Sequence, residues 1–126
     1  MTAKEYQKLA MRTNDGKCTE RMDNWKISAM CNGDNVGALL NGCLGLAGEA
    51  GEVLDIVKKW IFHCDSLNVE NLHKELGDVM WYVAMICDSM QISIEDVMEK
   101  NIEKLKMRYP EGFDIDKANN RQKDDL

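Results

Sequence analysis

Apolar residues recur at alternating steps of three and four along most of the chain, the spacing that places them on one face of an α-helix. One long helix is expected from Asp34 or Asn35, both good N-caps, to about His63. A second runs from Asn68 or Val69 to Met90. Each carries one apolar seam, and two such seams are expected to pack together. The seams are Leu39, Cys43, Leu46, Ala50, Val53, Val57 and Trp60, then Leu72, Leu76, Val79, Val83, Ile86 and Met90.

Shorter helices are expected on both sides of this pair. Thr2 and Glu5 form a capping-box pattern before a short helix that buries its apolar residues, Tyr6, Leu9 and Ala10. Residues 13–34 are polar, yet a short helix is indicated by the spacing of Cys18, Met22, Trp25 and Ala29. The last helix begins after Ser93 and ends at Pro110 and Gly112. The prediction is an all-α bundle of four to five helices in a single domain, residues 1–126, with a flexible polar tail at 115–126.

Composition and charge remove several classes of function. The chain has 126 residues, 44% of them hydrophobic, and a formal charge of −6. A protein that binds nucleic-acid polymers through their phosphates is excluded, since no long basic run is present. No segment approaches the roughly 18 apolar residues of a membrane span, and residues 1–10 lack an apolar signal core, so a cytosolic protein is expected. Five cysteines at wide spacing indicate buried free thiols rather than disulfides or a zinc site.

Two acidic pairs with the same spacing stand out, Glu49 with Glu52 and Glu75 with Asp78. Each pair shares one helix face, on the flank of its seam. Like charges at ~4 Å repel by about 1 to 4 kcal/mol unless a cation lies between them, which predicts a metal site. Alternatively, the acids are solvated and paired with nearby lysines, Lys58, Lys59 or Lys74. Asp55 points away from the seam and is interpreted as ordinary surface.

Oxygen ligands alone favour a hard ion, Mg²⁺ with Mn²⁺ as a possible substitute. A di-iron bundle would need Glu-x-x-His on two helices, whereas this chain has one copy, ending at His73. His73 is therefore expected at the surface or in a hydrogen bond.

Glycine recurs every three residues in the first long helix, at Gly45, Gly48 and Gly51. Each glycine costs about 1 kcal/mol relative to alanine in a helix interior. Such a helix is expected to approach another helix or a ligand closely, and helix packing is the favoured interpretation.

In the last helix, a stripe that begins with Ile94 and Val97 turns polar and basic at Asn101, Lys104 and Arg108. Arginine and lysine suit phosphate oxygens, so the stripe is a candidate wall of a phosphate site. The alternative is that these cations balance the helix C-terminus.

Four segments together resemble the MazG-like nucleotide pyrophosphohydrolases: Gly45-Leu-Ala-Gly-Glu-Ala-Gly-Glu-Val53, Lys58-Lys-Trp-Ile-Phe-His63, Glu75-Leu-Gly-Asp-Val-Met-Trp-Tyr-Val83 and Asn101-Ile-Glu-Lys-Leu-Lys-Met-Arg-Tyr-Pro-Glu-Gly-Phe113. The resemblance covers about residues 36–114. It implies an all-α homodimer or homotetramer that hydrolyses nucleoside or deoxynucleoside triphosphates to the monophosphate and pyrophosphate. The metal ligands and catalytic acids it implies are Glu49, Glu52, Glu75 and Asp78, and the substrate-binding residues are Lys59, Asn101, Lys104 and Arg108.

On this hypothesis the acids hold Mg²⁺ against the triphosphate, and Glu49 is the candidate to orient or deprotonate the attacking water. Lys104 and Arg108 steady the leaving phosphates. One aromatic residue is expected at most to stack on the base, from the set Trp25, Trp60, Trp81 and Tyr82. Residues 13–34 have no family counterpart and are candidates for the base pocket or a lid.

Two features leave alternatives open. The family often has glycine where this chain has Cys64, which affects the loop after the first long helix rather than the metal site. A helical metal-binding or interaction module without catalysis is the competing hypothesis.

Overall fold

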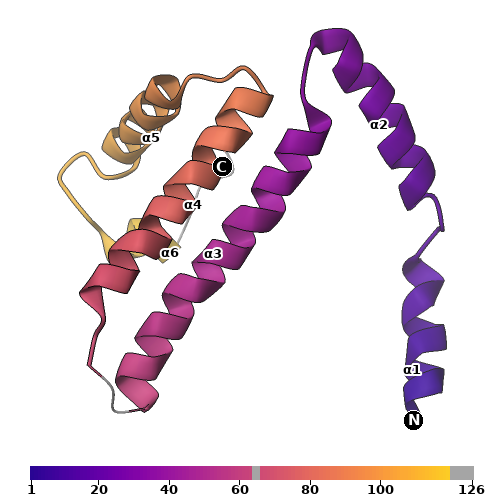
Figure 1. The fold of residues 1–126 in the computed structure, drawn as a ribbon, viewed down its shortest axis with the longest axis horizontal. Helices are drawn as coiled ribbons and strands as arrows, with labels where there is room; N and C mark the ends of the chain where they lie inside the picture. The colour runs from indigo at the N-terminus through magenta and orange to yellow at the C-terminus, as the bar shows by residue number, and fades with distance from the viewer. Residues whose placement is uncertain (64–65, 120–126) are drawn as a thin grey trace.

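The computed structural model describes residues 1–63 and 66–119, and the regular structure in these ranges is entirely helical (Figure 1). The all-α fold class is therefore confirmed. The elements are α1 (Ala3–Ala10), a 3₁₀ turn η1 (Met11–Thr13), α2 (Cys18–Asn32), α3 (Val36–Phe62), α4 (Val69–Ser89), α5 (Ile94–Arg108) and the short α6 (Ile115–Asn119). Helix α6 lies in the predicted flexible tail, whose remaining residues are outside the described part.

Helices α1, α3, α4 and α5 begin where their capping residues predict. Thr2 Oγ1 accepts from the amide of Glu5 at 3.2 Å, and Glu5 Oε2 accepts from the amide of Thr2, which completes the capping box. At α3, α4 and α5 the N-cap side chains alone act, and each accepts a hydrogen bond from the amide three residues on: Asn35, Asn68 and Ser93. These hydrogen bonds satisfy amides that the first helical turn leaves without partners. Local chemistry thus sets the starts of both long helices.

Helices α3 and α4 form the central antiparallel pair (Figure 1), and two glycines of α3 bring them close. A Cβ atom at Gly42 would lie 2.7 Å from Cγ1 of Ile86, and one at Gly45 would overlap the ring of Tyr82. Close helix approach is therefore confirmed at Gly45. Gly48 and Gly51 have open space where a Cβ would be, so packing within the chain does not explain them.

The face of α3 that meets α4 is turned by about 80° from the predicted seam, because it passes through Gly42 and Gly45. Along that seam Leu39, Leu46, Val53 and Val57 are half-buried, but Cys43, Ala50 and Trp60 are exposed. The seam of α4 is half-buried as predicted, except at Leu76, which is 44% exposed. The contact with α4 lies on the glycine side of α3 because glycine permits a closer approach than the larger residues of the seam.

The best-buried side chains gather where the α2–α3 turn meets the end of α4. Ala29, Val36, Cys87 and Ser89 are buried there. The amide of Asn35 donates to the Ser89 carbonyl at 2.8 Å, and the Gln91 side-chain amide donates to the Gly33 carbonyl at 3.2 Å. Gly33 and Gln91 both have positive φ, 81° and 55°, which reverses the chain at each turn. This junction fixes one end of the α3–α4 pair.

Elsewhere the chain exposes apolar side chains that a globular protein usually buries. Tyr6 and Leu9 are 61% and 53% exposed, so the prediction that α1 buries them within this chain is wrong. Helix α2 diverges from α3, and α1 continues away from the central pair (Figure 1). Polar contacts stabilise the region of α1 and α2 locally, between Thr2 and Glu5 and between Asp15 and Arg21.

The thiols follow the prediction only in part. Cys87 is a buried free thiol, whereas Cys18 and Cys43 are exposed free thiols. Cys64, with the loop shape that depends on it, lies outside the described residues. Among the described helices, none is both long and apolar enough to cross a membrane.

Candidate metal centre

The antiparallel register of α3 and α4 brings three predicted acids together. Gly45 lies against Tyr82, so one turn further along α3 Glu49 lies opposite Asp78, one turn earlier on α4. Glu75 is a further turn away on the same face of α4. One carboxylate oxygen from each of Glu49, Glu75 and Asp78 lies within 4.8 Å of the other two. Acids distant in sequence thus meet at the helix contact itself.

The fourth predicted acid, Glu52, lies just outside this group of three. It is exposed on α3, one turn beyond Glu49. Its charge is near enough to help raise the pKa of Glu49. The described structure therefore brings Glu49, Glu75 and Asp78 together and leaves Glu52 at the margin.

Glu49 is the acid most affected by its surroundings. Partial burial is the largest cause that raises its pKa above 4.5, followed by the charges of Asp78, Glu75 and Glu52 and a hydrogen bond with Glu75. Burial and like charges both disfavour the negative charge of Glu49. A divalent cation would relieve both effects, and hard oxygen donors are the ligands that Mg²⁺ or Mn²⁺ prefers.

The lysines that could have neutralised the acids hold other carboxylates. Lys58 and Lys59 both pair with Asp55, and Lys74 pairs with Glu70 at 3.3 Å. The two lysines lower the pKa of Asp55 to about 2. Asp55 is half-buried, pairs with two exposed lysines and lies outside the carboxylate group, in agreement with its interpretation as a surface charge. These pairs also weaken the alternative that the four acids are simply neutralised by lysine.

The predicted phosphate-binding residues lie on α5. Asn101 is exposed, while Lys104 and Arg108 are half-buried on the same face of the helix. The guanidinium carbon of Arg108 lies 5.9 Å from the ring centre of Tyr109. None of the three belongs to the carboxylate group. Lys59, the other predicted substrate contact, is held at Asp55.

The aromatic candidates divide into two kinds. Tyr82 packs against α3 at Gly45 and makes an edge-to-face contact with Trp81 at 4.9 Å between ring centres. Trp25, Trp60 and Trp81 are 43%, 46% and 57% exposed. Tyr82 therefore shapes the helix contact one turn from Asp78, a role that the sequence analysis missed. The signal was present in the spacing of Gly42 and Gly45 opposite the larger pair Tyr82 and Ile86.

A carboxylate cluster at the contact of two antiparallel helices defines an all-α protein with a candidate divalent-metal centre. The family model of the MazG nucleotide pyrophosphohydrolase domain matches residues 40–113, which include the cluster and α5. The chain is similar to the gene 37 protein of Mycobacterium phage L5, with 36% identity over 92 residues that cover 70% of this chain and 81% of that protein. No solved structure matches the chain. The chain belongs to the MazG nucleotide pyrophosphohydrolase domain family.

Proposed function

We propose that this protein hydrolyses nucleoside or deoxynucleoside triphosphates to the monophosphate and pyrophosphate in a Mg²⁺-dependent reaction, as part of the upkeep of the nucleotide pool. The observation that carries the proposal is the meeting of Glu49, Glu75 and Asp78 at the α3–α4 contact in a chain of this family. Mn²⁺ is a possible substitute for Mg²⁺. The cytosolic location stays a prediction from the sequence.

The donor set fits a hard divalent ion. Glu49, Glu75 and Asp78 offer carboxylate oxygens, and burial, followed by the charges of the neighbouring acids, raises the pKa of Glu49. Glu52, at the margin of the cluster, is the proposed fourth ligand. Bound Mg²⁺ would neutralise phosphate charge and act as a Lewis acid toward the bond between the α- and β-phosphates.

The residues of the chain have distinct proposed tasks. Glu49 orients or deprotonates the attacking water, because its carboxylate lies in the cluster beside the other two acids, where a metal-bound water would be held. Asn101, Lys104 and Arg108 bind the phosphate oxygens from α5, with Arg108 suited to a bidentate contact. Lys59 is the remaining proposed substrate contact, and its ammonium group is paired with Asp55.

The experiment is a pyrophosphate-release assay with Mg²⁺ over a panel of canonical and modified nucleotides. Glu52→Gln and Asp78→Asn are expected to lower both activity and Mg²⁺ affinity, by at least tenfold for Asp78→Asn. Glu70→Gln is the matched control, since Glu70 lies on α4 in an exposed pair with Lys74 and should leave both unchanged. If no nucleotide releases pyrophosphate and both variants bind metal like the parent protein, the enzyme hypothesis fails. The competing hypothesis, a helical module without catalysis, would then hold.

We also propose that the active form is a homo-oligomer, a homodimer or homotetramer. The chain exposes 10553 Å², about half as much again as the ~6,800 Å² expected for a folded monomer of 14.4 kDa. Obligate subunit interfaces bury roughly 2,000 to 5,000 Å² in total. A partner subunit of the same kind would cover apolar side chains that this chain leaves exposed.

A further inference from the structure

One face of α3 is apolar although it lies away from α4. Leu40, Leu44, Ala47, Gly51 and Leu54 follow one another at steps of four and three, so they form one stripe along the helix. Leu40 is turned by about 180° from Glu49, which faces α4. Leu40, Leu44 and Leu54 are 49%, 67% and 68% exposed. We call this set the outer stripe of α3.

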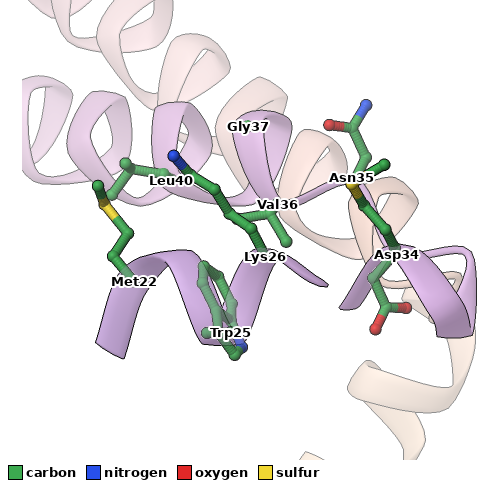
Figure 2. A pocket seen from close by; sticks show the side chains of 9 residues that line it. Met22, Trp25, Lys26, Asp34, Asn35, Val36, Gly37 and Leu40 are labelled. Atoms are coloured by element: carbon green, nitrogen blue, oxygen red, sulfur yellow. The ribbon is translucent and has the colours of Figure 1, made fainter. Parts of the chain in front are cut away.

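Helix α2 covers only the beginning of the outer stripe. A cavity of about 510 Å³ lies between the two helices, with Met22, Trp25 and Met30 on the α2 side and Val36 and Leu40 on the α3 side. Figure 2 shows Met22 and Lys26 reaching from α2 toward Leu40. Beyond this point α2 and α3 diverge (Figure 1), and the stripe continues uncovered by α2. Helices α2 and α3 thus form a V, and the outer stripe lies on the side of α3 that faces α2.

A small-molecule site for the substrate base does not fit this cavity within one chain. Leu40 precedes Glu49 by nine residues, about 13 Å along the helix, and it projects from the opposite side. A nucleotide bound at the carboxylate cluster would have to pass around α3 to reach the cavity. A protein surface is the better match for a long apolar stripe that continues from the cavity.

The outer stripe is also nearly symmetric in side-chain size about position 49. Ala47 and Gly51 lie two residues before and after it, and Leu44 and Leu54 lie five residues before and after it. In an antiparallel pair of such helices, Leu44 of one helix would therefore lie opposite Leu54 of the other. Ala47 would lie opposite Gly51 in the same way. Self-complementarity of this kind is what a two-fold interface requires. Small residues at the centre allow the two helices to approach closely.

We propose that α3 pairs through its outer stripe with α3 of a second copy, antiparallel, about a two-fold axis beside Ala47 and Gly51. The inference rests on the homo-oligomer of the proposed function and identifies the face that forms it. The chain exposes more surface than a folded monomer of its size, and the symmetry of the stripe favours a second copy as the partner that covers it. Each chain then keeps its carboxylate cluster on the α4 side, away from this central helix pair.

Engineered disulfides test the direction of the pairing. In a Cys43→Ser background, the double variant Leu44→Cys with Leu54→Cys should form disulfide-linked dimers on oxidation. Each single variant should stay unlinked, because equal positions of antiparallel helices lie about 15 Å apart here and a disulfide needs Cα atoms within about 7 Å. The Cys43→Ser parent controls for the native thiols. Dimers from the single variants, or none from the double variant, would overturn the proposal.

A second test enlarges the centre of the interface. Gly51→Leu adds a side chain where the chain itself has open space, so the protomer should keep its helix content. Sedimentation is expected to show at least tenfold weaker dimerisation. Gly77→Leu on α4 is the matched control, because it also replaces a helical glycine with open space around it. A Gly51→Leu dimer as strong as the parent would contradict the proposal. Pyrophosphate release by the unlinked parent reports separately on the proposed enzyme.

Discussion

At the scale of single residues, Glu49 shows why the cluster is a poor arrangement without a cation. Burial and three neighbouring acids raise its pKa above 4.5, so its ionised form opposes folding. The stability that the protonated form provides is present at low pH and is lost as the pH rises from 4.5 through the higher folded value. At neutral pH the metal-free chain therefore bears a destabilising charge at the α3–α4 contact.

Replacing Glu49 by glutamine should remove this effect. Without divalent metal at pH 7, Glu49→Gln is expected to raise the melting temperature by roughly 2 to 5 °C. With Mg²⁺ the order should reverse, because the parent protein gains a ligand interaction that the variant lacks. Thermal unfolding followed by circular dichroism, with EDTA and with Mg²⁺, measures both differences. Equal stabilisation of both proteins by Mg²⁺ would argue against Glu49 as a ligand.

Asp55 shows the opposite shift, with a clear pH signature. Hydrogen bonds from Lys58 and Lys59 lower its pKa to about 2 from an ordinary 3.8. Its contribution to stability is thus complete above 3.8 and is lost as the pH falls toward about 2. Carboxyl ¹³C NMR titration should give a midpoint near 2 in the parent, and one near 3.8 in the Lys58→Met, Lys59→Met double variant. An unchanged midpoint would show that the two lysines do not hold Asp55 in solution.

At the scale of elements, the pairing of α3 with α4 depends on glycine where the helices touch. Gly42 and Gly45 leave room for Ile86 and Tyr82, and this register brings Glu49 to Asp78. The acid cluster is therefore a consequence of helix packing one turn away. A larger residue at Gly45 would therefore disturb both the packing of α3 on α4 and the acid cluster.

Gly45→Ala separates packing from helix propensity. Alanine favours the helix by about 1 kcal/mol, but its Cβ overlaps the ring of Tyr82, so a net loss of about 1 to 3 kcal/mol is expected. Gly77→Ala, with open space around it, should instead stabilise the protein slightly. Urea unfolding measures both changes. Recovery of stability when Tyr82→Leu is added to Gly45→Ala would identify the clash as the cause.

The helix starts could be predicted from the sequence, whereas the contact face could not. Asn35, Asn68 and Ser93 act locally, because each accepts a hydrogen bond from the backbone amide three residues on. The side of α3 that meets α4 depends on which residues allow the closest approach, a property of two helices at once. For this reason the face of α3 that contacts α4 differs from the predicted seam, although the acids on the flank of that seam do meet those of α4.

At the scale of the whole molecule, the described part of the chain has few well-buried residues, most of them at one junction. The sequence showed long apolar seams and indicated a partner subunit, but it could not show which faces stay uncovered. The same limit applies to the site. The meeting of Glu49, Glu75 and Asp78 follows from one helix contact. The proposed approach of Asn101, Lys104 and Arg108 to a substrate would depend on the proposed assembly as well.

A chain whose stability depends on partner subunits should unfold according to its concentration. The melting temperature is expected to rise by several degrees between about 1 and 100 μM protein, because association favours the folded state by mass action. Calorimetry over this range, with sedimentation at matching concentrations, measures the effect. A melting temperature independent of concentration, together with a monomer in sedimentation, would contradict the homo-oligomer.

The junction of Asn35 with Ser89 and of Gln91 with Gly33 also has a consequence for the order of events in folding. Gly33 and Gln91 are 58 residues apart in the sequence, and most of the residues between them belong to the α3–α4 hairpin. Once the hairpin has formed, little chain entropy remains to be lost in closing the junction. We therefore expect the hairpin, with its acids in place, to form first. Helices α2 and α5, which leave from the junction, would take up their directions afterwards.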